Sequence, residues 1–363
     1  MSKIIVDNTK VSEEKKISFG KDLFIVHPGV SKARKAISEV HRASKEGADP
    51  KCLLLTGVAG SGKTATMRYY ETRFPRHNDE KGPVVPILFT TIPAPATIKG
   101  MAAYLLDSLG DPMACTGSIT SQTMRLHRLI KESRVELIML DDGQHLLNSS
   151  SNRVTMAACQ WLKHLINATG ISMVLAGTPP LVHIFSAHEQ LKTRVATRID
   201  LAPFGWETEA EQMNFMRVLK TIEMRLPFQE SSHLDSREMA FRLFGASQGV
   251  MSRVMDIVRE AARLALDRGE KNITLNVFAL AYHKIFAFFA SNKANPFLMD
   301  ISELARQFMK PSERHGDYNL RKAMEKTQHQ REKELDAGLK LRKINYSTAS
   351  ARQIKAVALE KGS

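Results

Sequence analysis

The sequence predicts an α/β fold, in which a parallel five-stranded sheet covered by helices on both faces is followed by a smaller all-helical domain. Two observations support this prediction. In the first 205 residues, short apolar runs alternate with segments of helical periodicity, as expected for parallel strands joined by crossover helices. After Pro203 the apolar runs stop, and apolar residues recur only at helical spacing.

Each predicted strand is a nearly continuous apolar run, which is typical of a strand buried on both faces. The strands are assigned to residues 51–57, 83–90, 135–141, 171–178 and 196–204. Helical spacing is found at 31–44, from Gly62 onward, and at 97–109, 120–132, 153–168 and 180–190. The later helices are expected at 207–225, 236–245, 250–268 and 274–290.

These segments divide the chain into four parts. A polar N-terminal arm (1–22) precedes the α/β domain (23–205), and the helical domain (206–298) precedes a C-terminal tail (299–363). The tail is highly charged and poor in apolar residues, so we expect a solvated helix or a disordered segment.

The composition narrows the class of protein. The 363 residues include 52 Lys and Arg against 38 Asp and Glu, a net charge of +14 that favours polyanionic partners such as nucleic acid. Solubility alone is the alternative explanation. No apolar run approaches the roughly 18 residues of a membrane span, and the N-terminus lacks a signal-peptide core. The three distant cysteines, Cys52, Cys115 and Cys159, indicate a reduced cytoplasmic protein.

A phosphate-binding loop follows the first strand. GVAGSGKT (57–64) matches G-x-x-x-x-G-K-[ST], and it lies between a predicted strand and a predicted helix, as the motif requires. Its backbone N–H groups and the helix N-terminus would face the anion. Lys63 would reach the β- and γ-phosphates, and Thr64 would coordinate Mg²⁺. The predicted nucleotide-binding residues are Gly57, Val58, Ala59, Gly60, Ser61, Gly62, Lys63 and Thr64.

The third strand ends in two adjacent acids. A P-loop needs a carboxylate at the end of a neighbouring strand to hold magnesium through water, and VELIMLDDGQHLL (135–147) is the apolar segment that ends in acids. We therefore assign Asp141, with Thr64, to the Mg²⁺ site. The alternative role for Asp141 is a helix N-cap.

Asp142 is then the predicted base that polarises the attacking water. Asp is one methylene shorter than Glu, and a displacement of about 1 Å can cost on the order of 10²-fold in rate. Hydrolysis is therefore slow, or the backbone compensates, or Gln144 orients the water instead. The alternative is that Asp142 only caps the next turn. Thr178, at the end of the fourth strand, could contact the γ-phosphate or the water, or could simply end the strand before two prolines.

The order of these motifs resembles that of an AAA+ ATPase with a helical lid domain. More narrowly, the chain resembles the TniB/TnsC regulators of CRISPR-associated and related transposons, which are relatives of MuB. The residues that carry the resemblance are LIMLDDGQHLL, LAGTPP (174–180), EQLKTRVATRIDLAPF (189–204), EMRLPFQESSHL (223–234) and SQGVMSRVMDIVREAA (247–262). The family commonly has Glu as its second acid, so Asp142 is a departure.

The resemblance implies a bacterial protein that binds ATP and Mg²⁺ and assembles as a ring or helical filament on double-stranded DNA. It would connect a TniQ-like target-selection protein to the transposase. The resemblance also implies an arginine finger that reaches a neighbouring subunit, at Arg194 or else Arg198, and a second sensor at Arg253. A surface ion pair is the alternative for either finger residue, and the spacing of Arg253 is looser than in the best-known AAA+ pattern.

Candidate DNA contacts follow from the same resemblance, since the segment after the second strand of AAA+ DNA binders often faces the channel. These residues are Lys99, Thr120, Ser121 and Arg125. Sequence-independent binding needs cations and hydroxyl donors for phosphates, although each of these residues could instead be an ordinary surface residue.

The predicted function is an ATP-dependent, sequence-independent DNA-binding regulator of transposition with slow ATPase activity. One alternative is an NTP-dependent signalling switch that binds protein partners and not DNA, against which the net charge argues. A translocating helicase or clamp loader is another. Such a motor predicts aromatic residues that stack on bases along the channel, and residues 90–100 contain none.

Overall fold

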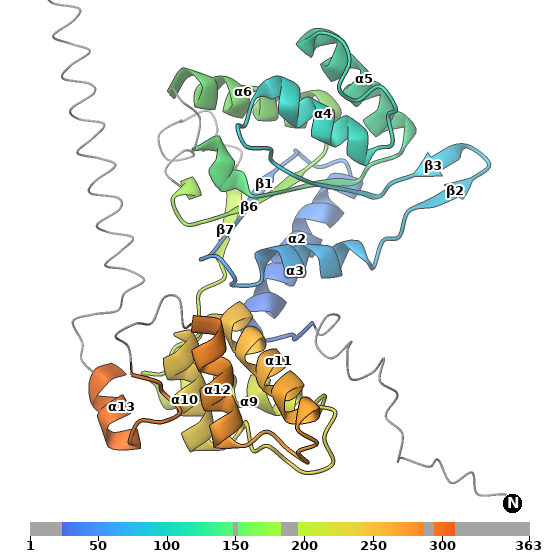
Figure 1. Cartoon of the computed structure of the whole chain (residues 1–363). Helices are drawn as coiled ribbons and strands as arrows, with labels where there is room; N and C mark the ends of the chain where they lie inside the picture. The colour runs from blue at the N-terminus through green and yellow to red at the C-terminus, as the bar shows by residue number, and fades with distance from the viewer. Residues whose placement is uncertain (1–23, 148–151, 183–194, 287–293, 309–363) are drawn as a thin grey trace, which may run out of the picture. The chain divides into compact units, whose positions relative to one another are not determined.

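The computed structural model describes residues 24–147, 152–182, 195–286 and 294–308 (Figure 1). Residues Met1–Leu304 form one compact unit and Ala305–Ser363 a second. The predicted arm (1–22), most of the predicted helix at 180–190, and the tail beyond residue 308 lie outside the described residues.

Five parallel strands form the main sheet, as predicted. They are β1 (Cys52–Thr56), β4 (Ile87–Thr91), β5 (Leu137–Asp141), β6 (Met173–Gly177) and β7 (Val195–Asp200). Their order across the sheet is β4-β5-β6-β1-β7. The chain runs from β1 to the edge strand β4, returns through β5 and β6, and passes β1 to reach β7. The carboxyl end of β1 therefore lies where the strand order reverses, a usual place for a ligand in α/β sheets.

The second strand was predicted too early in the chain. It begins at Ile87 and not at residue 83, because Pro83 and Pro86 have no N–H to donate to a ladder. Pro83 instead lies in a two-stranded antiparallel hairpin, β2 (His77–Asp79) and β3 (Gly82–Val84), that the sequence analysis missed.

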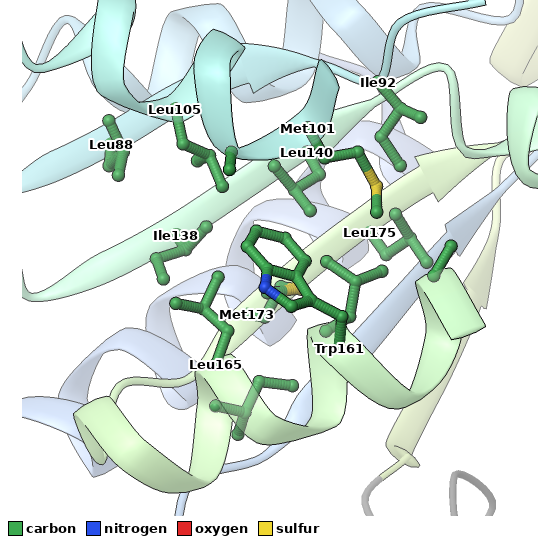
Figure 2. Packing of buried hydrophobic residues seen from close by; sticks show 14 of the residues in the cluster. Leu88, Ile92, Met101, Leu105, Ile138, Leu140, Trp161, Leu165, Met173 and Leu175 are labelled. Atoms are coloured by element: carbon green, nitrogen blue, oxygen red, sulfur yellow. The ribbon is translucent and has the colours of Figure 1, made fainter. Parts of the chain in front are cut away.

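Helices cover both faces of the sheet (Figure 1). On one face lie α4 (Ile98–Ser108), α5 (Ile119–Glu132) and α6 (Asn152–Thr169), and on the other lie α2 (Pro28–Lys45) and α3 (Lys63–Glu71). Side chains of successive strand residues point to opposite faces. In β5, Ile138 and Leu140 join the cluster shown in Figure 2, whereas Leu137 and Met139 join the opposite cluster.

This two-sided burial explains why the strands are apolar throughout. In the cluster of Figure 2, Trp161 and Leu165 of α6 and Met101 and Leu105 of α4 pack together with strand residues such as Ile138 and Leu140. Fully burying one aliphatic side chain contributes about 1.5–3 kcal/mol to stability. Because many such side chains are buried along the strands, packing holds the strands in position, and with them the polar residues at their carboxyl ends.

The later part of the chain is helical, as predicted. Its helices are α9 (Glu209–Glu223), α10 (Arg237–Ser247), α11 (Met251–Asp267), α12 (Leu275–Phe286) and α13 (Ile301–Phe308). Helix α9 begins at a capping box, in which the Thr208 hydroxyl accepts from the Glu211 N–H and the Glu211 carboxylate accepts from the Thr208 N–H. Gln248, in the left-handed region, ends α10, and two residues separate it from the start of α11.

No described helix is long and apolar enough to cross a membrane. The three cysteines are free: Cys52 and Cys159 are buried, and Cys115 is exposed.

Candidate nucleotide-binding site

The P-loop residues 57–64 connect β1 to α3, as the motif predicts. Gly62 is the N-cap of α3 and has a φ of +95°, a left-handed conformation that favours glycine. The loop therefore turns sharply into the first turn of the helix, whose orphan N–H groups form a site for an anion.

Lys63 turns back over the loop. Its Nζ donates hydrogen bonds to the carbonyl oxygens of Gly57 at 2.8 Å and Val58 at 2.9 Å. Burial lowers the pKa of Lys63, while the negative charges of Asp141, Asp142 and Asp200 act in the opposite direction. One ammonium group and three carboxylates thus surround the N-terminus of α3, a setting suited to a phosphate chain with a divalent cation.

Asp141 contacts Thr64, as the magnesium assignment requires. The Thr64 hydroxyl donates to Asp141 Oδ2 at 2.5 Å, and the Asp142 N–H donates to Asp141 Oδ1 at 2.8 Å. Asp141 is 3% exposed. A hydroxyl and a carboxylate are hard oxygen ligands of the kind Mg²⁺ prefers. Among the residues described, no three or more His, Cys, Asp or Glu side chains form a metal-binding group. The donor set thus fits Mg²⁺ that takes its remaining ligands from phosphate and water.

Asp142 lies beside Asp141 in a strained conformation. Its φ of +53° and ψ of +39° place a non-glycine residue in the left-handed region, which costs on the order of 1–3 kcal/mol. Its side chain makes no capping hydrogen bond to the 3₁₀ turn η1 (Gly143–Leu146) that follows. The simple capping role is therefore wrong.

Gln144 makes hydrogen bonds to residues at the carboxyl ends of both β5 and β6. Its Nε2 donates to Asp142 Oδ1 at 2.8 Å, and its Oε1 accepts from the Thr178 N–H at 3.2 Å. Asp142, Gln144 and Thr178, all candidates from the sequence, thus form one hydrogen-bonded chain from β5 to β6. Thr178 contributes its backbone N–H to this chain.

A second set of hydrogen-bonded polar side chains lies at the carboxyl ends of β1 and β7. The buried Thr56 hydroxyl donates to Asp200 Oδ1 at 2.7 Å, and Arg198 Nε donates to the Thr56 hydroxyl at 3.3 Å. Arg198 is exposed. Sequence analysis missed Thr56 and Asp200, although both lie at strand ends next to motif residues. Arg194 lies outside the described residues.

The N-terminus of α11 contacts the P-loop. The Ser252 N–H donates to the Gly60 carbonyl at 3.1 Å, and a Cβ on Gly60 would lie 2.0 Å from Ser252 Oγ. The neighbouring Arg253, the predicted second sensor, is exposed and donates to Gln248 Oε1 at 3.2 Å. Ser252 was missed, because a serine in a helical segment carries no sequence signal for this contact.

The candidate DNA contacts have different surroundings. Lys99, Thr120 and Ser121 are exposed near the starts of α4 and α5. Arg125 donates to Asp111 Oδ2 at 3.0 Å and to the carbonyl oxygens of Met113 and Thr116. This network gives Arg125 a structural role in shaping the loop before α5, and its DNA contact stays a prediction.

Comparisons with known proteins agree with this fold. The family model described as "Bacterial TniB protein" matches residues 17–205, just over half of the chain. No curated protein matches the sequence.

Solved structures similar to this chain include three archaeal proteins. The ORC1 protein of Aeropyrum pernix in complex with DNA is 17% identical, with a TM-score of 0.57 over 74% of this chain and 69% of that chain. The Cdc6p protein of Pyrobaculum aerophilum is 13% identical, with a TM-score of 0.55 over 75% and 70%. The ORC2 protein of A. pernix, in ADPNP–ADP complexes, is 14% identical, with a TM-score of 0.54 over 72% and 70%. These likenesses confirm the predicted AAA+ fold.

Proposed function

The chain belongs to the bacterial TniB family and is an AAA+ ATPase, and from this premise we propose that it is an ATP-dependent, DNA-binding regulator of transposition. The observation that carries the proposal is the P-loop site of Lys63, Thr64 and Asp141, on a chain with a net charge of +14. The site supplies the nucleotide chemistry, and the charge favours a polyanion.

ATP would bind along the P-loop, with Mg²⁺ held by Thr64 and Asp141. Lys63 would exchange its two carbonyl acceptors for phosphate oxygens. A bound Mg²⁺ would neutralise charge on the β- and γ-phosphates. The buried carboxylate of Asp141 is already oriented by the Asp142 N–H, so little reorganisation is needed for the site to accept the cation.

Asp142 would accept the proton of the attacking water, and Gln144 would hold the Asp142 carboxylate in place. Because Gln144 also accepts from the Thr178 N–H, a change at the γ-phosphate would be transmitted between β5 and β6. The short Asp142 side chain would keep turnover slow, since reaction rates fall steeply with displacement of the base.

A neighbouring subunit would complete the site with Arg194, or else with Arg198. Fingers of this kind are worth roughly 10³–10⁵ in rate in related NTPases. ATP would thereby favour a ring or helical filament, and hydrolysis would dismantle it.

Duplex DNA would bind this oligomer without base recognition, through exposed cations and hydroxyls such as Lys99, Thr120 and Ser121. Contacts of this type go to phosphates and carry no direct sequence information. The DNA-bound oligomer would then connect a TniQ-like target-selection protein to the transposase.

Retention on duplex DNA, with a non-hydrolysable ATP analogue and increasing salt, tests the proposal. Each phosphate contact should contribute a slope of about −0.9 in log K against log salt. Lys99→Ala should weaken retention, whereas Lys81→Ala, an exposed lysine in the β2–β3 hairpin turn, is the matched control. Absence of nucleotide-dependent DNA binding at low salt would favour a signalling switch that binds proteins.

A further inference from the structure

A cationic cleft is lined by residues of α2 and by residues at and just after the C-terminal end of α3. Both helices lie on the sheet face opposite α4–α6 (Figure 1). Its volume is about 410 Å³, and its walls are Ser31, Arg34, Lys35, Ser38, Tyr70, Arg73 and Phe74. Tyr70 follows Lys63 by seven residues along α3, about 10 Å at 1.5 Å per residue. The cleft is therefore separate from the nucleotide site.

Three cations line this cleft without an acid to balance them. In the part of the chain that the structure describes, Arg34, Lys35 and Arg73 form no ion pair, whereas Arg68 of α3 pairs with Glu71 at 3.0 Å. Among the described residues, no carboxylate lines the cleft. Glu136, which acts electrostatically on Tyr70, is held by His41 and Lys45, each at 3.0 Å. The described residues therefore leave the positive charge of the cleft uncompensated.

Arg34 is held in place with donor capacity to spare. Its guanidinium lies 4.7 Å from the centroid of the Tyr69 ring, and that ring stacks on Phe24 at 4.3 Å. Arg34 Nε is buried and makes no hydrogen bond. A buried N–H without an acceptor is costly, and an anionic oxygen in the cleft would satisfy it.

Hydroxyl groups complete the lining. Ser31 and Ser38 lie on α2, and the Tyr70 hydroxyl on α3 lies 3.1 Å from His41 Nδ1. Hydroxyls donate to anions as well as to neutral acceptors. The residues that line the cleft thus carry two guanidinium groups, an ammonium group and three hydroxyls.

We propose that this cleft binds a phosphate group. Arginine forks match phosphate oxygens bidentately, and the lysine adds a point charge. The phosphate comes either from a DNA strand or from a small phosphate compound. This site is independent of the proposed function, since none of the predicted nucleotide or DNA contacts lies in it.

Binding of inorganic pyrophosphate to the full-length chain, measured by titration calorimetry, tests the proposal. Lys63→Ala is used as the background to weaken the P-loop site. In that background, Arg34→Gln with Arg73→Gln should lower the pyrophosphate affinity about tenfold or more, as expected for lost charge-assisted hydrogen bonds. Lys32→Gln with Arg42→Gln removes the same charge from α2 outside the cleft, and its affinity should stay within about twofold.

A second variant keeps the test decisive if the double substitution unfolds the protein. Ser31 is exposed in the first turns of α2, where an acid is favourable to the helix. Ser31→Asp should therefore fold, place a carboxylate among the cations and abolish pyrophosphate binding. Failure of the Lys63→Ala chain to bind pyrophosphate, or equal affinity in the cleft and control variants, overturns the proposal.

Duplex DNA, used with the same variants and an intact Lys63, identifies the source of the phosphate. A larger loss of DNA affinity in the cleft variant than in the control assigns the site to a DNA strand. Equal DNA affinities, together with selective loss of pyrophosphate, assign it to a small phosphate compound.

Discussion

The side-chain amide of Gln144 donates to Asp142 Oδ1 at 2.8 Å, while its carbonyl oxygen accepts from the Thr178 N–H at 3.2 Å. The second acid of the DD pair is thus connected to the end of β6. A longer Glu at position 142 would alter this connection as well as the reach of the base. The short Asp142 and Gln144 therefore act as one unit.

Gln144→Leu should lower ATP turnover by on the order of 10²-fold, since the carboxylate of Asp142 would lose its positioning partner. Nucleotide affinity should change little, because the P-loop contacts are intact. Turnover and nucleotide affinity are measured separately. Gln144→Glu is the control, because it keeps the length of the side chain but places a carboxylate against Asp142, and it should also impair turnover. Normal turnover in both variants would contradict the hypothesis that Asp142 and Gln144 act together.

Asp142→Glu should raise turnover if the short side chain limits the rate. Because the longer Glu would also alter the hydrogen bond to Gln144, the change tests the reach of the side chain together with that contact. Asp142→Asn keeps the shape and removes the charge, and it should abolish turnover with nucleotide still bound. A fall in the rate of Asp142→Glu would point to Gln144 as the residue that orients the water, or to a rearranged backbone.

Lys63→Ala should abolish nucleotide binding, because the ammonium group that would pair with phosphate oxygens is removed. Lys32→Ala, an exposed lysine of α2, should bind nucleotide normally. Fluorescent-nucleotide titration separates the two variants. Undiminished binding by Lys63→Ala would refute the site.

Gly60→Ala should weaken nucleotide binding by displacing the N-terminus of α11, since a Cβ there would lie 2.0 Å from Ser252 Oγ. Gly47→Ala is a matched control, because Gly47 also has a positive φ (+73°) but has open space around its Cβ position. Both variants carry the backbone strain, about 1–2 kcal/mol. The difference in nucleotide affinity between them therefore reports the position of Gly60 in the P-loop together with its contact with α11, and equal affinities would contradict the importance of both.

Arg194→Ala should weaken ATP-dependent assembly, because a finger donated to the neighbouring subunit would be lost. Arg198→Ala is the comparison, since Arg198 Nε contacts Thr56 within its own chain. Light scattering with an ATP analogue measures assembly. If only Arg198→Ala impairs assembly, the finger is Arg198.

Much of the fold could be predicted because parallel strands are buried on both faces and are therefore apolar without interruption. The prediction from this pattern was wrong at residues 83–90, because this apolar run contains prolines. Strand β4 begins only at Ile87, and Pro83 belongs to the β2–β3 hairpin instead. Helix ends were predicted to within a few residues, since capping residues such as Thr208 are local signals.

The sequence by itself determined the P-loop, the acids Asp141 and Asp142, the order of strands and helices, and the resemblance to the TniB family. All of these depend on residues that are neighbours in the chain. Only the tertiary structure decided that Gln144 connects Asp142 to Thr178, that Ser252 contacts Gly60, and that Arg34 and Arg73 share a cleft that no described acid lines. These contacts join residues from different elements, and their geometry depends on how the sheet and helices pack, which no local pattern encodes.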